Sequence, residues 1–576
     1  MATYNETVTT ITATASVTAS ANLSMQGSVN TVTGTALLTA DANRTMQPGA
    51  DSIDVLSTVS ADAVYSIILQ TITGAADMTA KSLKAIRVGL ANGLTTSFVL
   101  GKKMYFLNGT DYFSYDGVQC QNVVPYIPTL AISKPPDGGG TTFEDFNLLG
   151  AGFKDSFSAD GTATVYQLSL TNLDSTAVTA VVNNVAKVEG TDFTVDRVLG
   201  KVTFTSAPTT GTNNVIVTAY KTQTGFADRI KKCRFHVFFG GANDTRVFIS
   251  GNPDFPNQIW RSGLYDPTYW PENGFYKIGS DSDKVQGFSK QYNYLVIHKE
   301  FSLWNMNYEL VNGVASFPIK PINDQVGTFA PRTIQSIENN PVSLSRDGVY
   351  MLTASNVRDE RNVVHISEQV DAKLLKEIDL QSVQSIDFDK KYWLAINGNV
   401  YIYDYLIKEW YLYDNINTSC LLERDGVLFF GSSTGGVVYR FVDETHLKPY
   451  EDDGVAIHAY WYSKLFNFDN PEHLKIVQRL FIEMKPNKHT SVKVYARSDR
   501  KGETLLLNTR MDQFDFLRLD FNRFSFVTSD IPQDTGKKVK MKKITHFQLK
   551  LENTSIDEGL GIMGLSLKWG LQNEVK

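Results

Sequence analysis

Residues 431–435, Gly431-Ser432-Ser433-Thr434-Gly435, match the Gly-x-Ser-x-Gly pattern of serine hydrolases. That chemistry requires a sharp turn from a strand into a helix, because the turn exposes the serine hydroxyl. Here the segment lies between two apolar runs of strand type, residues 427–430 and 437–441. The sequence therefore predicts a Gly/Ser hairpin at this position and no catalytic serine.

Metal and cofactor motifs are weak throughout the chain. Asp281-Ser282-Asp283 resembles the start of a calcium loop, but the glycine and the distal glutamate of an EF-hand are missing. The eight histidines show neither His-x-His nor His-Glu-x-x-His spacing, and no Walker loop or dinucleotide fingerprint occurs. Cys120, Cys233 and Cys420 are too scattered for a zinc site or a disulfide framework. We predict no catalytic, cofactor-binding or metal-binding residues, no cofactor and no enzymatic activity.

Five lysines gather between residues 537 and 543. Such a cluster could hold phosphates, but it is more often a solvated strand face or a guard against edge-to-edge aggregation, and that is the interpretation we favour from the sequence. The net charge of −6 argues against a protein that coats nucleic acid. A mildly acidic protein suits a conduit that must let a polyanion slide past without gripping it.

The elements that must position these residues are almost all strands. The chain has 576 residues, 26 Tyr, 33 Phe and 41 Gly, a composition that favours pleated sheets joined by tight turns. From about residue 84 to 450, paired apolar runs recur, several of them joined by Asn-Gly or Asp-Gly, and from the third pair on their spacing is typical of four-stranded propeller blades. Residues 368–379 predict one short helix. The six expected pairs are 103–107 with 112–115, 234–239 with 246–250, 292–298 with 301–304, 342–345 with 349–352, 392–396 with 400–403, and 427–430 with 437–441.

The fold class predicted is all-β, with a β-propeller of five to seven blades, an inserted small β-sandwich and a C-terminal β-sandwich. Residues 11–25 alternate apolar and polar side chains, which predicts an extended strand or, alternatively, a disordered low-complexity arm. No apolar stretch reaches 18 residues and no secretory signal is present, so we expect no membrane segment. The predicted parts are a Thr/Ala-rich extended β arm at 1–83, a first propeller part at 84–134, an inserted β module at 135–224, the rest of the propeller at 225–452 and the C-terminal sandwich at 453–576.

One group of segments carries a resemblance to a known family: Phe248–Pro253, Asn257–Gly263, Asp266–Pro271, Asn293–Lys299, the inserted Gly190–Asp196 with Val202–Phe204, and the C-terminal His546–Lys550 with Gly561–Gly564. These segments resemble the propeller proteins that form the nozzle or hub of short-tailed bacteriophage tails. The resemblance covers about residues 84–576 and is structural in kind, so it supplies no catalytic residue. Residues 1–83 do not match the family's start.

The resemblance implies a structural virion protein, assembled in the host cytoplasm into the tail below the portal and adaptor. Such proteins are ring-shaped homo-oligomers, often hexamers, that hold tail fibres and guide genome ejection. Double-stranded DNA would pass through the lumen without specific binding. Two alternatives stay open: a peripheral receptor-binding or adhesin protein that stacks sugars on aromatics between Trp260 and Trp270, and a propeller glycoside hydrolase. The turn Ser345–Gly348 is the nearest match to the sialidase repeat, but it lacks the tryptophan.

Overall fold

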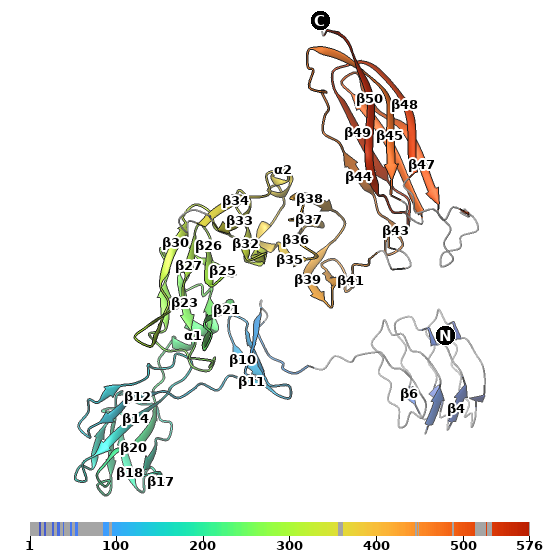
Figure 1. The fold of residues 1–576 in the computed structure, drawn as a ribbon. Coiled ribbons are helices and arrows are strands. Elements are labelled where there is room, and N and C mark those ends of the chain that lie inside the picture. The colour runs from blue at the N-terminus through green and yellow to red at the C-terminus, as the bar shows by residue number, and fades with distance from the viewer. Residues whose placement is uncertain are drawn as a thin grey trace. The chain divides into compact units, whose positions relative to one another are not determined.

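The protein is built almost wholly from antiparallel sheets joined by short turns (Figure 1). The computed structural model describes residues 85–91, 95–354, 361–443, 446, 449–485, 489–512, 526 and 533–574, and the backbone of seven short strands between residues 11 and 55. The chain divides into two compact units, residues 1–277 and 278–576. The all-β fold class is confirmed.

The seven N-terminal strands pair in parallel at a constant offset. Ile11 pairs with Val32 and Val32 pairs with Ile53, an offset of 21 residues each time, and Val17 pairs with Leu38 at the same offset. The predicted extended arm thus contributes to two different sheets at Ile11–Thr12 and Val17–Thr18, and the rest of residues 11–25 lies outside the described residues. These strands are β1 (Ile11–Thr12), β2 (Val17–Thr18), β3 (Gln26–Gly27), β4 (Thr31–Gly34), β5 (Leu38–Thr39), β6 (Gln47–Pro48) and β7 (Ser52–Val55).

Two four-stranded meanders in the first unit share one apolar core. Its largest members, Trp260 and Trp270, are 1% and 0% exposed and lie among residues from both sheets, such as Phe98 and Val247. Aromatic rings fill the space between two pleated surfaces well, which explains why these strands are rich in them. The strands are β8 (Thr96–Leu100), β9 (Lys103–Leu107), β10 (Tyr112–Tyr115) and β11 (Cys120–Asn122), then β21 (Phe235–Gly241), β22 (Asp244–Ser250), β23 (Gln258–Arg261) and β24 (Phe275–Lys277).

The inserted module consists of a six-stranded and a three-stranded sheet around a separate core that includes Phe153, Phe157, Tyr166 and Phe193. Its first strand begins at Thr129, because β12 pairs with β14, so the sheet starts before the boundary predicted at residue 135. The helix α1 (Phe226–Lys231) follows it. The strands are β12 (Thr129–Lys134), β13 (Thr141–Thr142), β14 (Gly152–Ala159), β15 (Val165–Gln167), β16 (Thr179–Val182), β17 (Val185–Lys187), β18 (Phe193–Asp196), β19 (Lys201–Phe204) and β20 (Gly211–Tyr220).

Four further sheets begin the second unit, and neighbouring sheets pack face to face. The strand Lys391–Ile396 shows why: Tyr392 and Leu394 point into the core shared with the preceding sheet, whereas Trp393 and Ala395 point into the core shared with the next one. A strand buried on both faces is apolar at nearly every position. The turn Asn397-Gly398 that follows has φ of 50° and 79°, as a tight hairpin requires.

The strands of these sheets follow one another along the chain, and all six hairpins predicted from sequence are antiparallel pairs. The predicted helix is shorter than expected, because α2 spans only Asp371–Leu374. Further along the chain, β42 (Glu451–Asp452) and β43 (Val455–Ala456) form a small separate hairpin. The strands are β25 (Val285–Gln291), β26 (Tyr294–Lys299), β27 (Leu303–Met306), β28 (Glu309–Val311), β29 (Val314–Ser316), β30 (Ile319–Asn323), β31 (Gln335–Ile337), β32 (Asn340–Ser345), β33 (Gly348–Ala354), β34 (Arg361–His365), β35 (Gln384–Phe388), β36 (Lys391–Ile396), β37 (Asn399–Asp404), β38 (Glu409–Tyr413), β39 (Thr418–Arg424), β40 (Val427–Ser432) and β41 (Val438–Arg440), with 3-10 turns at Pro331–Thr333 and Leu380–Ser382.

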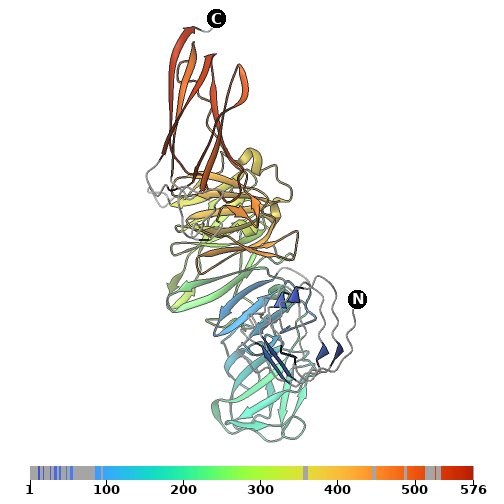
Figure 2. The same cartoon turned by 90° about the vertical axis from the view of Figure 1, so that its right-hand side faces the viewer.

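The C-terminal domain, residues 459–574, has longer strands arranged in two sheets (Figure 2). One sheet has the order β44-β49-β46-β47 and the other β48-β45-β50. Alternate side chains of both sheets, among them Leu480, Val494 and Phe547, form a common core. The strands are β44 (Ala459–Tyr462), β45 (His473–Met484), β46 (His489–Ser498), β47 (Lys501–Asp512), β48 (Gln533–Ile544), β49 (Phe547–Asn553) and β50 (Ile562–Glu574).

Candidate functional site

The Gly-x-Ser-x-Gly segment lies in a turn between two strands, as predicted. β40 ends at Ser432 and pairs with β41, which begins at Val438. The hydroxyl oxygen of Ser432 accepts hydrogen bonds from the backbone N–H groups of Thr434 and Gly435 at 3.2 and 3.1 Å. The strand-to-helix turn of a hydrolase nucleophile is therefore replaced by a hairpin at this position.

A lysine occupies the oxygen-rich corner that the Asp-Ser-Asp segment suggested for calcium. The ammonium of Lys299 donates to the carbonyl oxygens of Ile278 and Ser280 at 2.5 and 3.0 Å, and lies 3.6 Å from a carboxylate oxygen of Asp283. Asp283 also accepts hydrogen bonds from the backbone of Phe301 and the hydroxyl of Ser302. Burial lowers the pKa of Lys299, while Asp283 opposes that shift. The carboxylate is thus engaged in neutralising a buried side chain.

Among the described residues, His365 at the end of β34 meets Ser367 and Asp371, in an arrangement that differs from a catalytic triad. His365 Nε2 and the hydroxyl of Ser367 both bond to the carboxylate of Asp371, at 2.8 and 2.5 Å. Ser367 is fully buried and its oxygen also accepts the N–H of Val349. In a catalytic triad the histidine lies between the serine and the acid. Here a single nitrogen, Nε2 of His365, faces both the carboxylate of Asp371 and, at 3.3 Å, the hydroxyl of Ser367. The cluster ties β33 and β34 to helix α2.

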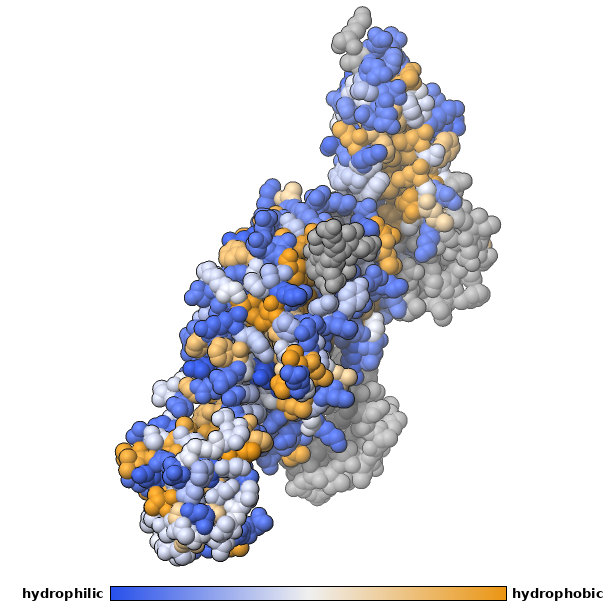
Figure 3. Space-filling model, turned by 60° about the vertical axis from the view of Figure 1, so that its left-hand side comes forward, coloured by the Kyte–Doolittle hydropathy of each residue, from blue (hydrophilic) through white to orange (hydrophobic). Residues whose placement is uncertain are grey.

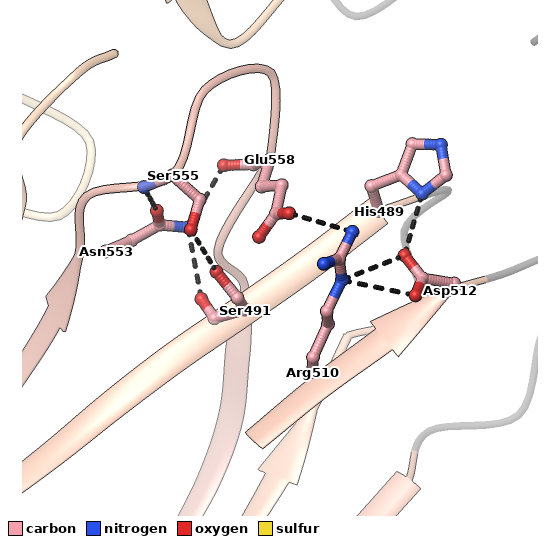
Figure 4. Close-up of polar contacts among 7 residues, drawn as sticks. All are labelled: His489, Ser491, Arg510, Asp512, Asn553, Ser555 and Glu558. Atoms are coloured by element: carbon pink, nitrogen blue, oxygen red, sulfur yellow. Dashed lines mark hydrogen bonds and ion pairs between the residues drawn. The ribbon is translucent and has the colours of Figure 1, made fainter. Parts of the chain in front are cut away.

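A polar cluster lies at one end of the C-terminal domain (Figure 4). The guanidinium of Arg510, on β47, lies 3.2 Å from a carboxylate oxygen of Asp512 and 3.2 Å from one of Glu558. His489, at the start of β46, contacts the same Asp512 through Nδ1 at 2.9 Å. Glu558 belongs to the turn between β49 and β50, and its side chain is only 1% exposed. Arg510 therefore links β47 to the turn, and Asp512 links β47 to His489 at the start of β46.

Hydrogen bonds around Asn553 fix the same turn from its other side. The side-chain amide of Asn553 donates to the carbonyl oxygens of Ser491 and Glu558, both at 3.0 Å, and its oxygen accepts the N–H of Ser555 at 2.8 Å. The hydroxyls of Ser491 and Ser555 are 3.1 Å apart (Figure 4). Each side chain drawn has a partner within the cluster, which indicates a structural clamp.

An exposed aromatic strand lies along the edge of the first sheet of this domain. Tyr460, Trp461 and Tyr462 of β44 are 53%, 50% and 41% exposed, and among the described strands β44 has a neighbour on only one side, β49. A strand edge with free backbone groups and large apolar side chains is a template for another chain. Figure 3 shows a band of apolar side chains on the C-terminal domain. We take this edge as the candidate functional site.

A charged pair anchors the aromatic edge to its neighbour. Lys550 lies 2.8 Å from Glu552, both on β49, and His458 approaches the same carboxylate at 3.0 Å. The ammonium of Lys550 lies 5.7 Å from the ring centre of Tyr462, within cation–π range. The hydrogen bond from Lys550, followed by the one from His458, lowers the pKa of Glu552 to about 2. The carboxylate thus stays ionised beside the edge at any ordinary pH.

The second sheet also ends in an open strand. Within the described part of this domain β50 pairs with β45 alone, and Met563 and Leu571 of β50 are 60% and 50% exposed. Its Trp569 stacks on Phe468 at 4.6 Å between ring centres and remains 37% exposed. β47 and β48 are in contact at the other side of the two sheets. The aromatic edge and the β50 edge therefore lie on the same, open side of this domain.

Sequence reasoning missed these edges, although the run Ala459-Tyr460-Trp461-Tyr462 carries the signal of apolar side chains at consecutive positions.

In the described part of the chain, no group of three or more His, Cys, Asp or Glu side chains could hold a metal ion. The three cysteines are free thiols: Cys233 is buried, Cys120 partly so and Cys420 exposed. None of the helices within the described ranges is long and apolar enough to cross a membrane.

Comparisons with known proteins add little. No family model matches the chain, and no curated protein does. Among solved structures, an exo-beta-1,3-galactanase from Phanerochaete chrysosporium with galactose is similar over 57% of this chain and 93% of its own, at 8% identity and a TM-score of 0.21. The extracellular domain of a one component system from B. thetaiotaomicron matches over 61% and 51%, at 10% identity and a TM-score of 0.21. Likenesses of this size carry no inference about the fold or the activity of this chain.

Proposed function

We propose that this chain is a structural virion protein of a phage tail, a nozzle or hub ring around the DNA channel below the portal and adaptor. In this proposal the successive four-stranded sheets are blades of a β-propeller with five to seven blades. The inserted module and the C-terminal domain are then small sandwiches attached to it. The ring is a homo-oligomer, most simply a hexamer, that holds fibres and guides genome ejection from the virion.

The observation that carries the proposal is the open, aromatic side of the C-terminal domain. Three consecutive exposed aromatics on β44 and a thirteen-residue edge strand, β50, offer apolar area and backbone groups to a neighbouring copy. Removal of apolar surface from water is favourable by about 25 cal/mol per Å², and only the part that exceeds the freedom lost on association stabilises an oligomer. The sheet that contains Trp393 is packed against another sheet on each of its two faces. Such close packing makes each copy stiff, which suits a part under mechanical load.

The test is the assembly state of the full chain. Mass photometry of the purified protein should find a closed oligomer, and cryo-electron microscopy should place the copies around a central axis. In infected cells the protein should be found in the tail on the DNA axis. Monomers at micromolar concentration, or single copies away from that axis, would contradict the hub role.

A peripheral receptor-binding protein is the second candidate, because exposed tyrosine and tryptophan rings also stack on sugars. Of the aromatics first considered for that role, Trp260 and Trp270 are buried, whereas Tyr265 between them is 49% exposed. The exposed rings of β44 join Tyr265 in this candidate function. A glycan array with the purified full chain separates the two, since the hub proposal expects no glycan binding. Release of reducing sugar from host wall polysaccharide would instead favour a glycoside hydrolase.

A further inference from the structure

The outer face of the sheet β48-β45-β50 carries a row of like charges that crosses all three strands. Arg479 of the central strand pairs in register with Lys538 on one side and with Lys568 on the other. All three side chains are exposed, whereas their neighbours Leu480 and Val539 point into the core. Strands lie about 4.8 Å apart, so the three cationic side chains emerge close together.

Irregularities in β48 enlarge this positive area. Lys540 and Lys543 have φ of 54° and 56°, the left-handed region that non-glycine residues rarely adopt. Lys542 and Lys543 are consequently both exposed, although they follow each other between the buried Met541 and Ile544. We call the resulting surface the basic face; its six residues are Arg479, Lys538, Lys540, Lys542, Lys543 and Lys568.

The basic face is not neutralised by the ion pairs described in its own domain. Those pairs join other residues, Arg510 with Asp512 and Glu558, and Lys550 with Glu503 and Glu552. Glu483 lies further along β45, four residues from Arg479. Like charges that lie directly opposite each other across strands destabilise a sheet. This repulsion therefore lowers the stability of the folded domain, and a bound anion would offset it.

Protection against aggregation explains only part of the pattern. Lysines on an edge strand block edge-to-edge pairing, and β48 is such an edge. Arg479 lies on the central strand, where no edge needs protection, and Lys568 lies on the opposite edge strand. The row across the sheet calls for a partner that carries several negative charges spread over an area.

We propose that the basic face binds the phosphate backbone of double-stranded DNA without reading its sequence. Five of the six residues are lysines, compact point charges that contact phosphates without the fixed fork geometry of arginine. Spacings of about 4.8 Å across strands and about 6.8 Å between alternate residues spread the charges over a sheet surface, which fits an extended polyanion better than a single phosphate. The inference is independent of the ring proposed above, since a monomer would bind in the same way.

The test is the salt dependence of DNA binding by the full chain. Fluorescence anisotropy with a random-sequence duplex, between about 50 and about 200 mM salt, gives the slope of log K against log salt concentration. In the variant R479Q/K538Q/K568Q, we expect that slope to fall in magnitude by roughly 2 to 3, because each phosphate that a cation neutralises contributes about 0.9 to it. The matched control is R497Q/R500Q/K501Q, which removes three exposed positive charges around the β46–β47 turn of the other sheet. Its slope should equal that of the natural protein.

A second measurement keeps the outcome interpretable. Because the triple substitution relieves repulsion, the melting temperature of R479Q/K538Q/K568Q at low salt should match or exceed that of the natural protein. No duplex binding at about 50 mM salt, or an unchanged slope in the triple variant, would overturn the proposal. Binding of poly-glutamate by the basic face in place of DNA would also overturn it, in favour of an acidic protein partner.

Discussion

Lys134 and Asp155 form an ion pair inside the inserted module, with Nζ 3.3 Å from Oδ2 and side chains only 3% and 0% exposed. Ser169 completes it, because its N–H and its hydroxyl both donate to Asp155 at 2.6 Å. Burial lowers the pKa of Lys134, and the adjacent carboxylate opposes that shift. Each charge is tolerated in the interior only because the other is present.

Replacing Asp155 with alanine should therefore destabilise the module strongly. The substitution leaves a buried ammonium without its counter-ion, which typically costs about 3–5 kcal/mol. Urea unfolding of the full chain, followed by hydrogen exchange of residues in the module, measures the loss. K187A is the control, because the pair Lys187–Asp192 is about one-third exposed and should contribute less than about 1 kcal/mol. It leaves in place the hydrogen bond from the backbone N–H of Val188 to Asp192. Equal losses in the two variants would refute the argument.

His298 predicts a specific pH dependence of folding. The side chain is 1% exposed, its Nε2 lies 2.7 Å from the hydroxyl of Ser289, and burial lowers the pKa of His298 to about 3. An unfolded histidine takes up a proton near pH 6.5, whereas the folded one does not until about pH 3. The unfolded state therefore binds more protons in this window, and stability falls as the pH drops from about 6.5 to about 3.

The size of this effect is bounded by the shift of the pKa. At about 1.36 kcal/mol per pH unit, His298 would account for a loss of roughly 4–5 kcal/mol at most over the window. The variant H298Q lacks the titrating group, so its unfolding free energy should change less between pH 6.5 and pH 4. Parallel pH profiles for the natural protein and H298Q would show that His298 is not responsible.

Arg510 should matter more for stability than its partly exposed position suggests. Its guanidinium bridges Asp512 and the nearly buried Glu558, so R510A strips a buried carboxylate of its cation. We expect a loss of about 1–3 kcal/mol in the C-terminal domain, measured by thermal unfolding. In a double-mutant cycle, E558Q should cost less in the R510A background than in the natural protein. The control is R500A, which replaces an exposed arginine of the same domain and should change the stability little. If the losses for R510A and E558Q simply add in the double variant, the interaction between Arg510 and Glu558 contributes nothing to stability.

The antiparallel hairpins were predictable because their signals are local. Turns such as Asn397-Gly398 need a positive φ, and the flanking apolar runs alternate or are fully buried. Such a hairpin does not depend on how distant parts of the chain meet.

The sequence does contain a signal of the parallel pairing near the N-terminus, an internal repeat, which the alternation of residues 11–25 obscured. Residues 18–22, Thr-Ala-Ser-Ala-Asn, recur as Thr-Ala-Asp-Ala-Asn at residues 39–43, an offset of 21 residues. The strand register has that same offset. Comparison of the sequence with itself, rather than its period of two, would have predicted stacked short strands.

The open edges and the basic face could not be predicted, because both depend on which strands become neighbours. The lysines of residues 537–543 are visible in the sequence, but Arg479 lies far from them along the chain and meets Lys538 only through sheet register. Strand order likewise decides that β44 and β50 are edges. Non-local pairing of this kind is set by the packing of the two sheets and leaves no local pattern.

Trp461 offers the most direct test of the assembly proposal. Its ring is 50% exposed on β44, an edge strand, so W461K places a charge where a neighbouring copy would bury apolar surface. Burying a charge without a partner is unfavourable, and we expect the apparent dissociation constant of the oligomer to rise at least tenfold. The fold of the single copy should be unchanged, because the ring is half exposed in it.

The control for this substitution is L406K, which introduces a charge at another exposed apolar position. Leu406 is 59% exposed and lies in the turn between β37 and β38. Mass photometry over a dilution series compares the two variants with the natural protein, and circular dichroism verifies their folds. W461K should shift the distribution toward single copies while L406K leaves it in place. If W461K assembles as well as the natural protein, the aromatic edge is not an interface. A glycan array with the natural protein then measures the competing role of stacking on sugars, and W461K should lose any binding that depends on the Trp461 ring.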